Sequence, residues 1–159
     1  MYNELESYKY FYETAPVGFY TTSVNDGEFI HANKMCMKIL EVDSLEDLKK
    51  LKSKNFYLKN VRKNFIDLLK KGPVTDFEIE IKTPSGTAKS LLLTGNLKDG
   101  KYIEGCILDI TEKVNLEKEV LNLRNQNISF IKEVKQKADK RVKELKEEYC
   151  SLSLAIDVA

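Results

Sequence analysis

The sequence predicts an α+β domain in which an antiparallel sheet of about five strands carries short helices on one face, followed by a long coiled-coil helix. Three observations favour this class. All seven glycines and all three prolines lie within residues 16–105, whereas residues 106–159 contain neither. Apolar and charged residues alternate along residues 75–82, the period of a strand with one buried face. Strand-like segments come first as a pair, then as a group of three after several short helices, which is typical of one α+β domain.

The stretch without glycine or proline sets the expected domain boundaries. The 159-residue length allows one domain of ordinary size and an appendage. Residues 112–149 include 18 charged residues, a composition typical of a long exposed helix. We therefore expect an amphipathic helix over residues 1–15, a globular domain over residues 16–111 and a dimerising helix over residues 112–159.

Composition excludes several classes of function. Twenty-six Lys and Arg against 25 Asp and Glu give a net charge of +1, without the concentrated basic face of a nucleic-acid-binding protein. No apolar run approaches the ~20 residues of a membrane span, and the acidic N-terminus is unlike a signal peptide. The cysteines, Cys36, Cys106 and Cys150, are widely spaced, which favours reduced thiols in a cytoplasmic protein. One histidine, His31, is too few for a histidine metal cage within one chain.

The individual elements follow from apolar periodicity and from turn residues. The expected helices are residues 3–14, 35–40, 45–51 and 61–71. The expected strands are residues 18–24, 28–32, 75–82, 88–95 and 101–110. Asn33 is placed to cap the second helix. The apolar face of the fourth helix consists of Val61, Phe65, Leu68 and Leu69.

These elements, in this order, resemble a PAS domain, the sensor module of bacterial signalling proteins, over about residues 8–113. The most specific segment is residues 105–112, Gly-Cys-Ile-Leu-Asp-Ile-Thr-Glu, which is similar to the closing strand and Asp-Ile-Thr junction of that family. The Ala-Pro-Val-Gly step at residues 15–18, the strand that ends in Asn33 and the Pro-Ser-Gly turn at residues 84–86 are similar to other family segments. The resemblance implies a PAS sensor domain over residues 16–111.

Asp109 and Thr111 form the expected joint between the last strand and the long helix. Thr111 is suited to cap the helix, and Asp109 places a carboxylate near its first amides. A short hydrogen-bonded joint would pass strain from the sheet to the helix. The alternative is that the two residues are only a helix cap.

The resemblance implies that a ligand, where there is one, lies between the concave face of the sheet and the helices. Seven apolar residues are the candidates to line such a pocket: Phe19, Phe65, Leu69, Phe77, Ile79, Leu91 and Ile107. The alternative is that they are only the core, since burying one apolar side chain is worth ~1.5–3 kcal/mol.

The cofactor is left open, and the sequence disfavours flavin and haem. Photoactive flavin members of the family carry Asn-Cys-Arg-Phe-Leu-Gln before the long connecting helix, where residues 54–58 are Lys-Asn-Phe-Tyr-Leu, and their strand glutamine corresponds to Ile107. Haem-binding members usually take an axial histidine from the connecting helix, and residues 61–71 contain none. His31 is therefore expected to be a surface or a hydrogen-bonded histidine, and Cys36 and Cys106 are expected to be small apolar fillers.

No catalytic or metal site is expected. The carboxylates Asp76, Glu78 and Glu80 alternate with apolar residues, so they should share the solvated side of a strand rather than form a catalytic pair. An enzyme that acts through Cys36 or Cys106 is a remote alternative to a non-catalytic regulatory module.

The helical tail carries the pattern of a coiled coil, because its apolar positions advance in alternating steps of four and three. The first seam positions are Leu116, Val120, Leu123, Asn127, Phe130 and Val134, followed by Ala138, Val142, Leu145, Tyr149, Leu152 and Ile156. Two successive steps of four after Val134 indicate a stutter, and Asn127 would fix the register. A helix over residues 112–149 would be ~57 Å long. It could not bury its seam on the domain, so we expect a parallel homodimer.

We therefore predict a cytoplasmic sensor domain of a signal-transduction protein, such as a two-component system. It would bind a small ligand or a partner and act through a dimeric helix on an output domain such as a histidine kinase or a diguanylate cyclase. The alternative is a purely structural dimerisation or protein-interaction module with a packed, ligand-free core. Any kinase or cyclase activity is expected in another part of a parent protein.

Overall fold

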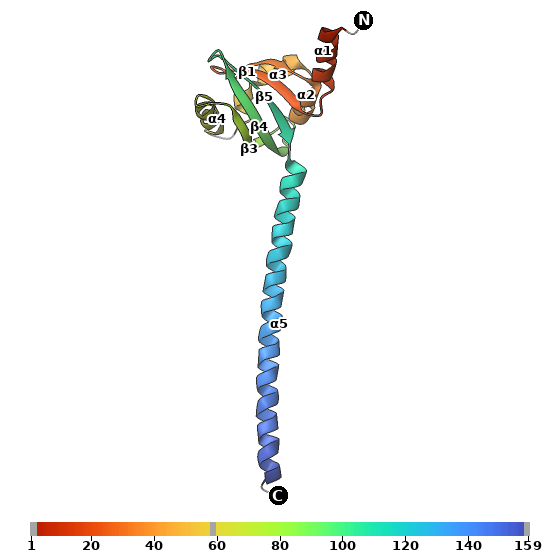
Figure 1. Ribbon diagram of the computed structural model, residues 1–159, viewed down its shortest axis with the longest axis vertical. Coiled ribbons are helices and arrows are strands. Elements are labelled where there is room, and N and C mark those ends of the chain that lie inside the picture. Colours follow the sequence, from red (N-terminus) through yellow and green to blue (C-terminus); the bar gives the residue numbers. More distant parts are fainter. Residues whose placement is uncertain (1–2, 58–59, 158–159) are drawn as a thin grey trace. The chain divides into compact units, whose positions relative to one another are not determined.

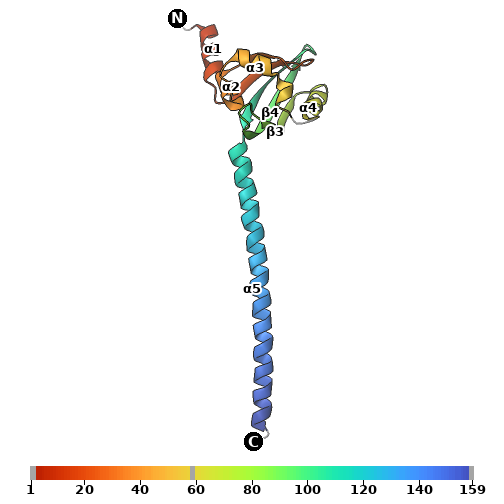
Figure 2. The same cartoon turned by 180° about the vertical axis from the view of Figure 1, so that it is seen from behind.

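The computed structural model describes residues 3–57 and 60–157, and the chain divides into two units, Met1–Val114 and Asn115–Ala159. Figure 1 shows the elements coloured along the chain, and Figure 2 shows them from behind. In chain order they are α1 (Glu4–Thr14), β1 (Gly18–Ser23), β2 (Phe29–Ala32), α2 (Lys34–Leu40), α3 (Leu45–Leu51), the 3₁₀ turn η1 (Ser53–Asn55), α4 (Val61–Leu69), β3 (Val74–Lys82), β4 (Ala88–Lys98), β5 (Tyr102–Asp109) and α5 (Thr111–Asp157).

The strands form one antiparallel sheet with the order β2-β1-β5-β4-β3. The last strand, β5, therefore lies in the middle, between β1 and β4 (Figure 1). Ile107 of β5 pairs with Gly18 of β1 on one side and with Leu93 of β4 on the other. The strand that leads into α5 is thus bonded along both edges, so a distortion of either neighbouring strand reaches it.

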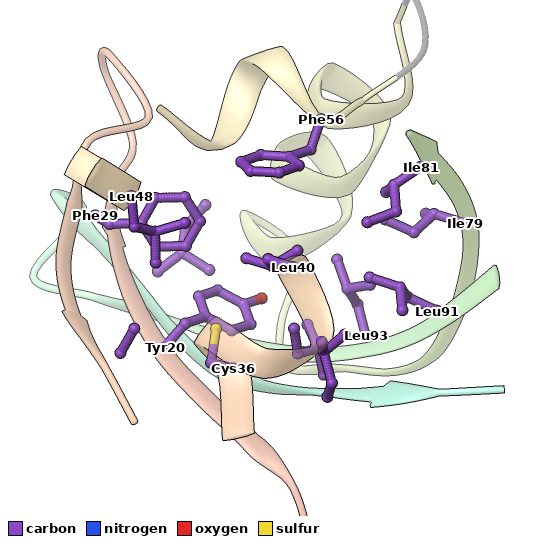
Figure 3. Close-up of a cluster of buried hydrophobic side chains, with 14 of the residues drawn as sticks. Tyr20, Phe29, Cys36, Leu40, Leu48, Phe56, Ile79, Ile81, Leu91 and Leu93 are labelled. Atoms are coloured by element: carbon purple, nitrogen blue, oxygen red, sulfur yellow. The ribbon is translucent and has the colours of Figure 1, made fainter. Parts of the chain in front are cut away.

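The short helices α2, α3 and α4 pack on one face of this sheet, as Figure 3 shows for the core between them. Side chains that alternate along each strand bury the facing surface, because successive residues of a strand point to opposite sides. The buried core consists of Tyr20, Phe29, Ala32, Cys36, Ile39, Leu40, Leu48, Phe56, Phe65, Leu69, Ile79, Ile81, Leu91, Leu93, Ile103 and Ile107. The predicted α+β class, with five antiparallel strands and helices on one face, is confirmed.

Asn33 fixes the start of α2 against the first strand. Its side-chain oxygen accepts hydrogen bonds of 2.9 Å from the amides of Cys36 and Phe19. Its side-chain nitrogen donates to the carbonyl oxygens of Tyr12 and Val17 at 2.8 and 2.9 Å. Asn33 is fully buried, and a buried amide requires such partners. The predicted cap is confirmed, and the same side chain also holds the segment between α1 and β1.

Gly18 lets α2 approach the sheet closely. A Cβ built on Gly18 would lie 2.7 Å from Cγ1 of Ile107 and 2.8 Å from Cα of Cys36. Any larger residue would therefore push α2 away from β1 and β5. The close approach places the first turn of α2 directly over the centre of the sheet.

The alternation predicted for residues 75–82 is wrong at its beginning. The pairing of β3 with β4 shifts between Val74 and Phe77, and Asp76 has a left-handed backbone with φ of 56°. Thr75, predicted to face inward, is exposed, whereas Val74 packs against the core. Beyond this bulge the prediction is confirmed, because Ile79 and Ile81 are buried and Glu78 and Glu80 are exposed.

Other differences are small. The 3₁₀ turn η1 was not predicted, α4 ends two residues earlier than expected, and β4 continues to Lys98. Leu68 is 40% exposed, whereas Ile66 packs against the core in its place. Helix α1 contains no buried residue, and Leu5, Tyr8, Tyr10 and Phe11 are largely exposed.

Helix α5 begins one residue before the expected helical range of residues 112–159 and continues to Asp157, past the charged stretch that ends at residue 149. The large apolar side chains of α5 from Leu116 to Leu152 lie at the surface, with between about half and three quarters of each side chain exposed. Among the described residues, no helix combines the length and the apolar character needed to cross a membrane.

Candidate functional site

A small cavity lies in the core between the inner face of the sheet and the helices, the place that the family resemblance implies for a ligand (Figure 3). Its volume is about 30 Å³. Strands supply one wall, and α2 together with the segment at η1 supplies the other. The lining residues are Tyr20, Thr22, Phe29, Cys36, Leu40, Ser53, Phe56, Tyr57, Ile79, Ile81, Leu91, Leu93 and Ile107.

Three of the seven predicted pocket residues, Ile79, Leu91 and Ile107, line this cavity. Ile79 and Leu91 face each other across β3 and β4. Ile107 of β5 pairs with Leu93 of β4, and its side chain packs closely over Gly18. All three are buried, as their alternation with polar or exposed residues predicts.

Phe65, Leu69 and Phe77 belong to the core but do not line the cavity, which corrects their predicted role. The rings of Phe65 and Phe77 pack against each other with centroids 5.1 Å apart. A Cβ built on Gly95 would lie 2.9 Å from Phe65 and 3.4 Å from Leu69. These side chains therefore fill the space between α4 and strands β3 and β4, and apolar character alone did not separate this region from the cavity.

Phe19 was also predicted to line the pocket, and this is wrong because the alternation of β1 was assigned with the opposite parity. Tyr20 and Thr22 are the buried positions of β1. Phe19 is partly exposed, and its ring stacks on Tyr12 of α1 with centroids 5.7 Å apart. The bulky apolar residue outweighed the polar one in the sequence, although the glycine at position 18 marks the inward parity.

The helical wall was missing from the prediction. Cys36 and Leu40 are four residues apart, so they lie on one face of α2 and point into the cavity together (Figure 3). Phe56 follows η1, and its ring lies edge-on to the ring of Phe29, with the ring centroids 6.3 Å apart (Figure 3). The spacing of the α2 pair could have identified it, whereas the 3₁₀ turn that positions Phe56 carries no periodic signal.

The two cysteines near the sheet differ in environment. Cys36 is fully buried, as expected of a small apolar filler. Cys106 is partly exposed, and its sulfur lies 2.9 Å from the hydroxyl oxygen of Thr94.

The titratable groups of the cavity are neutral. Burial raises the pKa of Cys36 and of Tyr57 to about 12, so both keep their protons at neutral pH. Burial also raises the pKa of Tyr20, whose hydroxyl donates a hydrogen bond of 3.1 Å to the carbonyl oxygen of Thr94. Among the described residues that line the cavity, none carries a charge. An ion would therefore enter without a compensating partner, at a high desolvation cost.

The volume of the cavity limits what it can hold without rearrangement. Pockets for ordinary small-molecule ligands measure ~300–1,000 Å³, whereas a water molecule needs only ~10–15 Å³ on the scale of this cavity. A flavin or a haem would require core side chains to move.

His31 is exposed on β2, as predicted. The described residues contain no group of three or more His, Cys, Asp or Glu side chains able to hold a metal ion.

The predicted joint between β5 and α5 is hydrogen-bonded. The carboxylate of Asp109 accepts bonds from the amide and the hydroxyl of Thr111, at 3.0 and 2.5 Å. The Thr111 hydroxyl oxygen also accepts a bond of 3.0 Å from the amide of Ser90 in β4. Thr111 is thus the first residue of α5 rather than its cap, and its side chain attaches the helix to a neighbouring strand.

Lys89 connects this joint to α2. Its ammonium lies 3.2 Å from a carboxylate oxygen of Glu41 and 3.5 Å from one of Asp109. It also donates a hydrogen bond of 2.8 Å to the carbonyl oxygen of Ile39 in α2. The Lys89 side chain is only 15% exposed, so these contacts are shielded from solvent more than an ordinary surface pair. Three elements, α2, β4 and β5, therefore meet at one cation.

Glu41 follows α2 directly and is held in a left-handed conformation, with φ of 57°. One oxygen of its carboxylate accepts a hydrogen bond of 2.8 Å from the Thr83 hydroxyl and another bond from Ser85. These hydroxyls, Ser85 first, lower the pKa of Glu41 to about 2. Burial acts to raise the pKa of Asp109, but the bonds from Thr111 and the charge of Lys89 outweigh it, and that pKa is lowered too. Both carboxylates are charged at neutral pH.

The comparisons with known proteins support the fold. No family model matches the sequence, and no curated protein matches it. Among solved structures, a PAS domain from Colwellia psychrerythraea is 15% identical with a TM-score of 0.58, over 69% of this chain and 99% of that one. A domain of a sensory box sensor histidine kinase/response regulator from Geobacter sulfurreducens is 16% identical with a TM-score of 0.55, over 67% and 94%. The chain therefore contains a PAS fold, and the predicted resemblance is confirmed.

Another structural neighbour is an RNA-binding light-oxygen-voltage receptor. It is 17% identical with a TM-score of 0.60, and the match covers 76% of this chain and 37% of that one. Since the fold is shared with such receptors, the fold itself does not decide between ligand classes. That flavin and haem are disfavoured stays a prediction from the sequence.

Proposed function

We propose that the chain is a PAS sensor domain that takes a small ligand in its core cavity and passes the change to a dimeric signalling helix. One observation carries the proposal: α2 contributes to the cavity and to the joint. Cys36 and Leu40 line the cavity, and the next residue, Glu41, pairs with Lys89. A ligand that displaces this side of α2 would act directly on the ion pairs at the beginning of α5.

The route continues from Glu41 to Lys89, from Lys89 to Asp109, and from Asp109 to Thr111, the first residue of α5. Each step is a hydrogen bond or an ion pair between 2.5 and 3.5 Å. Coupling between two sites of a protein is typically worth ~1–3 kcal/mol. A partly buried ion-pair network with several hydrogen bonds is of the right strength for this purpose.

The signalling helix requires a second copy in this proposal. The apolar seam of α5 is exposed in a single chain: Leu116, Val120, Leu123, Phe130 and Val134 are each about half exposed or more. With Asn127 these residues form one stripe with the spacing of a coiled coil. A parallel homodimer would bury the stripe and connect two sensor domains to one dimeric output domain.

The parts of the molecule have separate tasks in this account. We assign residues 1–15 to an amphipathic helix, residues 16–111 to the sensor domain and residues 112–159 to the signalling and dimerisation helix. The solved neighbours include domains of sensor histidine kinases. By analogy, the output is a histidine kinase or a diguanylate cyclase elsewhere in a cytoplasmic two-component or related protein, and this chain has no catalytic role.

A second function is favoured by the small volume of the cavity. A core with only about 30 Å³ of free space is close to fully packed. The alternative is therefore a structural dimerisation or interaction module with no ligand. It predicts the same dimer but no molecule retained by the core.

Native mass spectrometry and a visible absorption spectrum of the purified full chain distinguish the two. The sensor proposal predicts a dimer that carries a retained small molecule, or one that binds a small molecule added at millimolar concentration. A dimer that neither retains a molecule nor responds to any small molecule added at that concentration supports the structural module. A monomer at micromolar concentration contradicts both.

A further inference from the structure

One residue of the cavity wall carries a buried polar atom without a partner. The Ser53 hydroxyl oxygen is buried and has no hydrogen bond to any residue that the structure describes. Ser53 is only 6% exposed and lines the cavity. Buried hydroxyls in native proteins are nearly always hydrogen-bonded, so an unsatisfied one calls for an explanation.

The position of Ser53 is held by its backbone. Its amide donates a hydrogen bond of 2.6 Å to the carbonyl oxygen of Gly27 in the β1–β2 turn. A Cβ built on Gly27 would lie 2.7 Å from the Ser53 hydroxyl oxygen. An ion pair of 3.4 Å between Lys52 and Asp26 fastens the same two segments. Since the backbone of Ser53 is fixed, its hydroxyl can move only by rotation about the Cα–Cβ bond.

The surroundings of this hydroxyl limit the charge of a ligand. Tyr57, Cys36 and Tyr20 are the titratable side chains that line the cavity, and all three are neutral at neutral pH because burial raises their pKa. The rest of the wall is formed by aliphatic and phenyl side chains, with Thr22 as a further hydroxyl residue. The guanidinium of Arg62 lies near Gly27, with its Nε 3.4 Å from a Cβ built there. It donates hydrogen bonds of 2.8 and 2.9 Å to the carbonyl oxygens of Ser23 and Val24, however, and does not line the cavity. A wall without a charged side chain favours an uncharged polar group over an ion.

We propose that the cavity binds a small uncharged molecule of two or three non-hydrogen atoms, whose polar group makes a hydrogen bond with the Ser53 hydroxyl. This inference rests on the proposed function, because it names the ligand class of the same cavity. The size follows from the volume of about 30 Å³, which equals the space of roughly two water molecules. A ligand of three non-hydrogen atoms has a dissociation constant of ~1 mM at best, so binding is weak and depends on the ligand concentration.

The test compares three probes on the full-length chain by two-dimensional amide NMR. Formamide is neutral and has three non-hydrogen atoms, formate is its charged counterpart of the same size, and xenon is apolar. Formamide is expected to cause saturable shifts at Ser53 and at the cavity residues of α2, with a millimolar dissociation constant. Formate at the same concentration and ionic strength is expected to bind at least tenfold more weakly.

Ser53→Ala distinguishes binding that depends on the hydrogen bond from binding that depends only on the volume of the cavity. The variant is expected to weaken formamide binding at least fivefold and to leave xenon binding unchanged. Without a probe its melting temperature should equal that of the wild type or exceed it, because the substitution removes an unsatisfied buried group. Ser151→Ala, on the exposed surface of α5, is the matched control and should change neither quantity.

Two results would overturn the inference and leave the proposed function standing. Equal binding of formamide to the wild type and Ser53→Ala would show that the hydroxyl does not select the ligand. Formate binding as tightly as formamide would show that charge is not rejected. If xenon and formamide both fail to shift any cavity resonance, the cavity takes no small molecule, and the sensor proposal fails together with the inference.

Discussion

Ile107 belongs both to the buried core and to the wall of the cavity. It pairs with both neighbours of β5, lines the cavity and excludes any side chain at position 18. Its neutral, branched side chain occupies the position at which photoactive flavin relatives are expected to carry glutamine. Its role here is therefore to shape the cavity by volume rather than by hydrogen bonding.

Ile107→Ala is expected to lower the free energy of unfolding by ~2–5 kcal/mol, since it deletes a buried aliphatic side chain and enlarges the cavity. Chemical denaturation measures the loss. Leu108→Ala, at the adjacent position that is 43% exposed, is the control and should cost less than ~1 kcal/mol. A loss at Leu108 as large as that at Ile107 would contradict the assigned alternation of β5, and a larger one would mean that it is inverted.

Glu41 should make stability depend on pH in the acid range. Its pKa in the folded chain is about 2, below the ordinary 4.5. A lowered folded-state pKa means that the stabilisation is complete above the unfolded pKa and is lost as the pH falls through the folded one. We therefore expect the unfolding free energy of the wild type to fall between pH 4.5 and pH 2, as followed by denaturation at several pH values.

Glu41→Gln should flatten this part of the pH profile. Glu78→Gln, on the exposed side of β3, is the control and should retain it. A profile for Glu41→Gln that overlays the wild type would show that the Glu41 carboxylate does not stabilise the folded chain.

At the scale of elements, the sequence predicted most of what apolar periodicity and turn residues determine. The order of the helices and strands, the α3 bounds and the Asn33 cap follow from local patterns. The bulge at Asp76 does not, because a left-handed residue in a strand leaves no periodic signal before the pairing is known. The parity of β1 was also assigned wrongly, since Phe19 and Tyr20 are both aromatic and, apart from Gly18, the sequence carries no sign that Phe19 packs against α1.

The joint shows the same division between local and tertiary information. Asp109 and Thr111 are two residues apart in the sequence, so their mutual hydrogen bonds could be predicted. Glu41 and Lys89 are far from Asp109 along the chain, and only the pairing of β4 with β5 and the end of α2 bring the three together. No spacing rule within one sequence identifies such a triad.

The junction of α1, β1 and α2 depends on one side chain. Asn33→Ala should destabilise the chain by at least ~2 kcal/mol, because the substitution leaves buried amide and carbonyl groups without partners. Thermal or chemical denaturation measures the loss, and Asn96→Ala on the exposed end of β4 is the control. A cost for Asn33→Ala no larger than that of the control would show that water replaces the four bonds.

At the scale of the whole molecule, α5 should hold two copies together. Leu123→Glu puts a charge into the seam and is expected to shift the chain from dimer to monomer in light scattering at micromolar concentration. Leu121→Glu changes an equally exposed leucine outside the seam and should leave the dimer intact. Truncation after Thr111 should also yield a monomer. A dimer that survives Leu123→Glu would contradict the assigned seam.

The central claim is that the cavity and the beginning of α5 are energetically coupled through Glu41 and Lys89. A double-mutant cycle tests it without knowledge of the ligand. Leu40→Ala changes the cavity wall, and Asp109→Ala removes the carboxylate of the joint, at a cost of ~0.5–2 kcal/mol. Leu40→Ala with Glu78→Ala is the control cycle.

The free energy of unfolding, measured for the four proteins of each cycle at one concentration, gives the coupling directly. The account predicts that Leu40→Ala and Asp109→Ala interact by at least ~0.5 kcal/mol, as residues joined by one network do. The control cycle should be additive within ~0.3 kcal/mol. If the cycle through Asp109 is additive as well, α2 does not communicate with the joint, and the proposed route from the cavity to the helix is wrong.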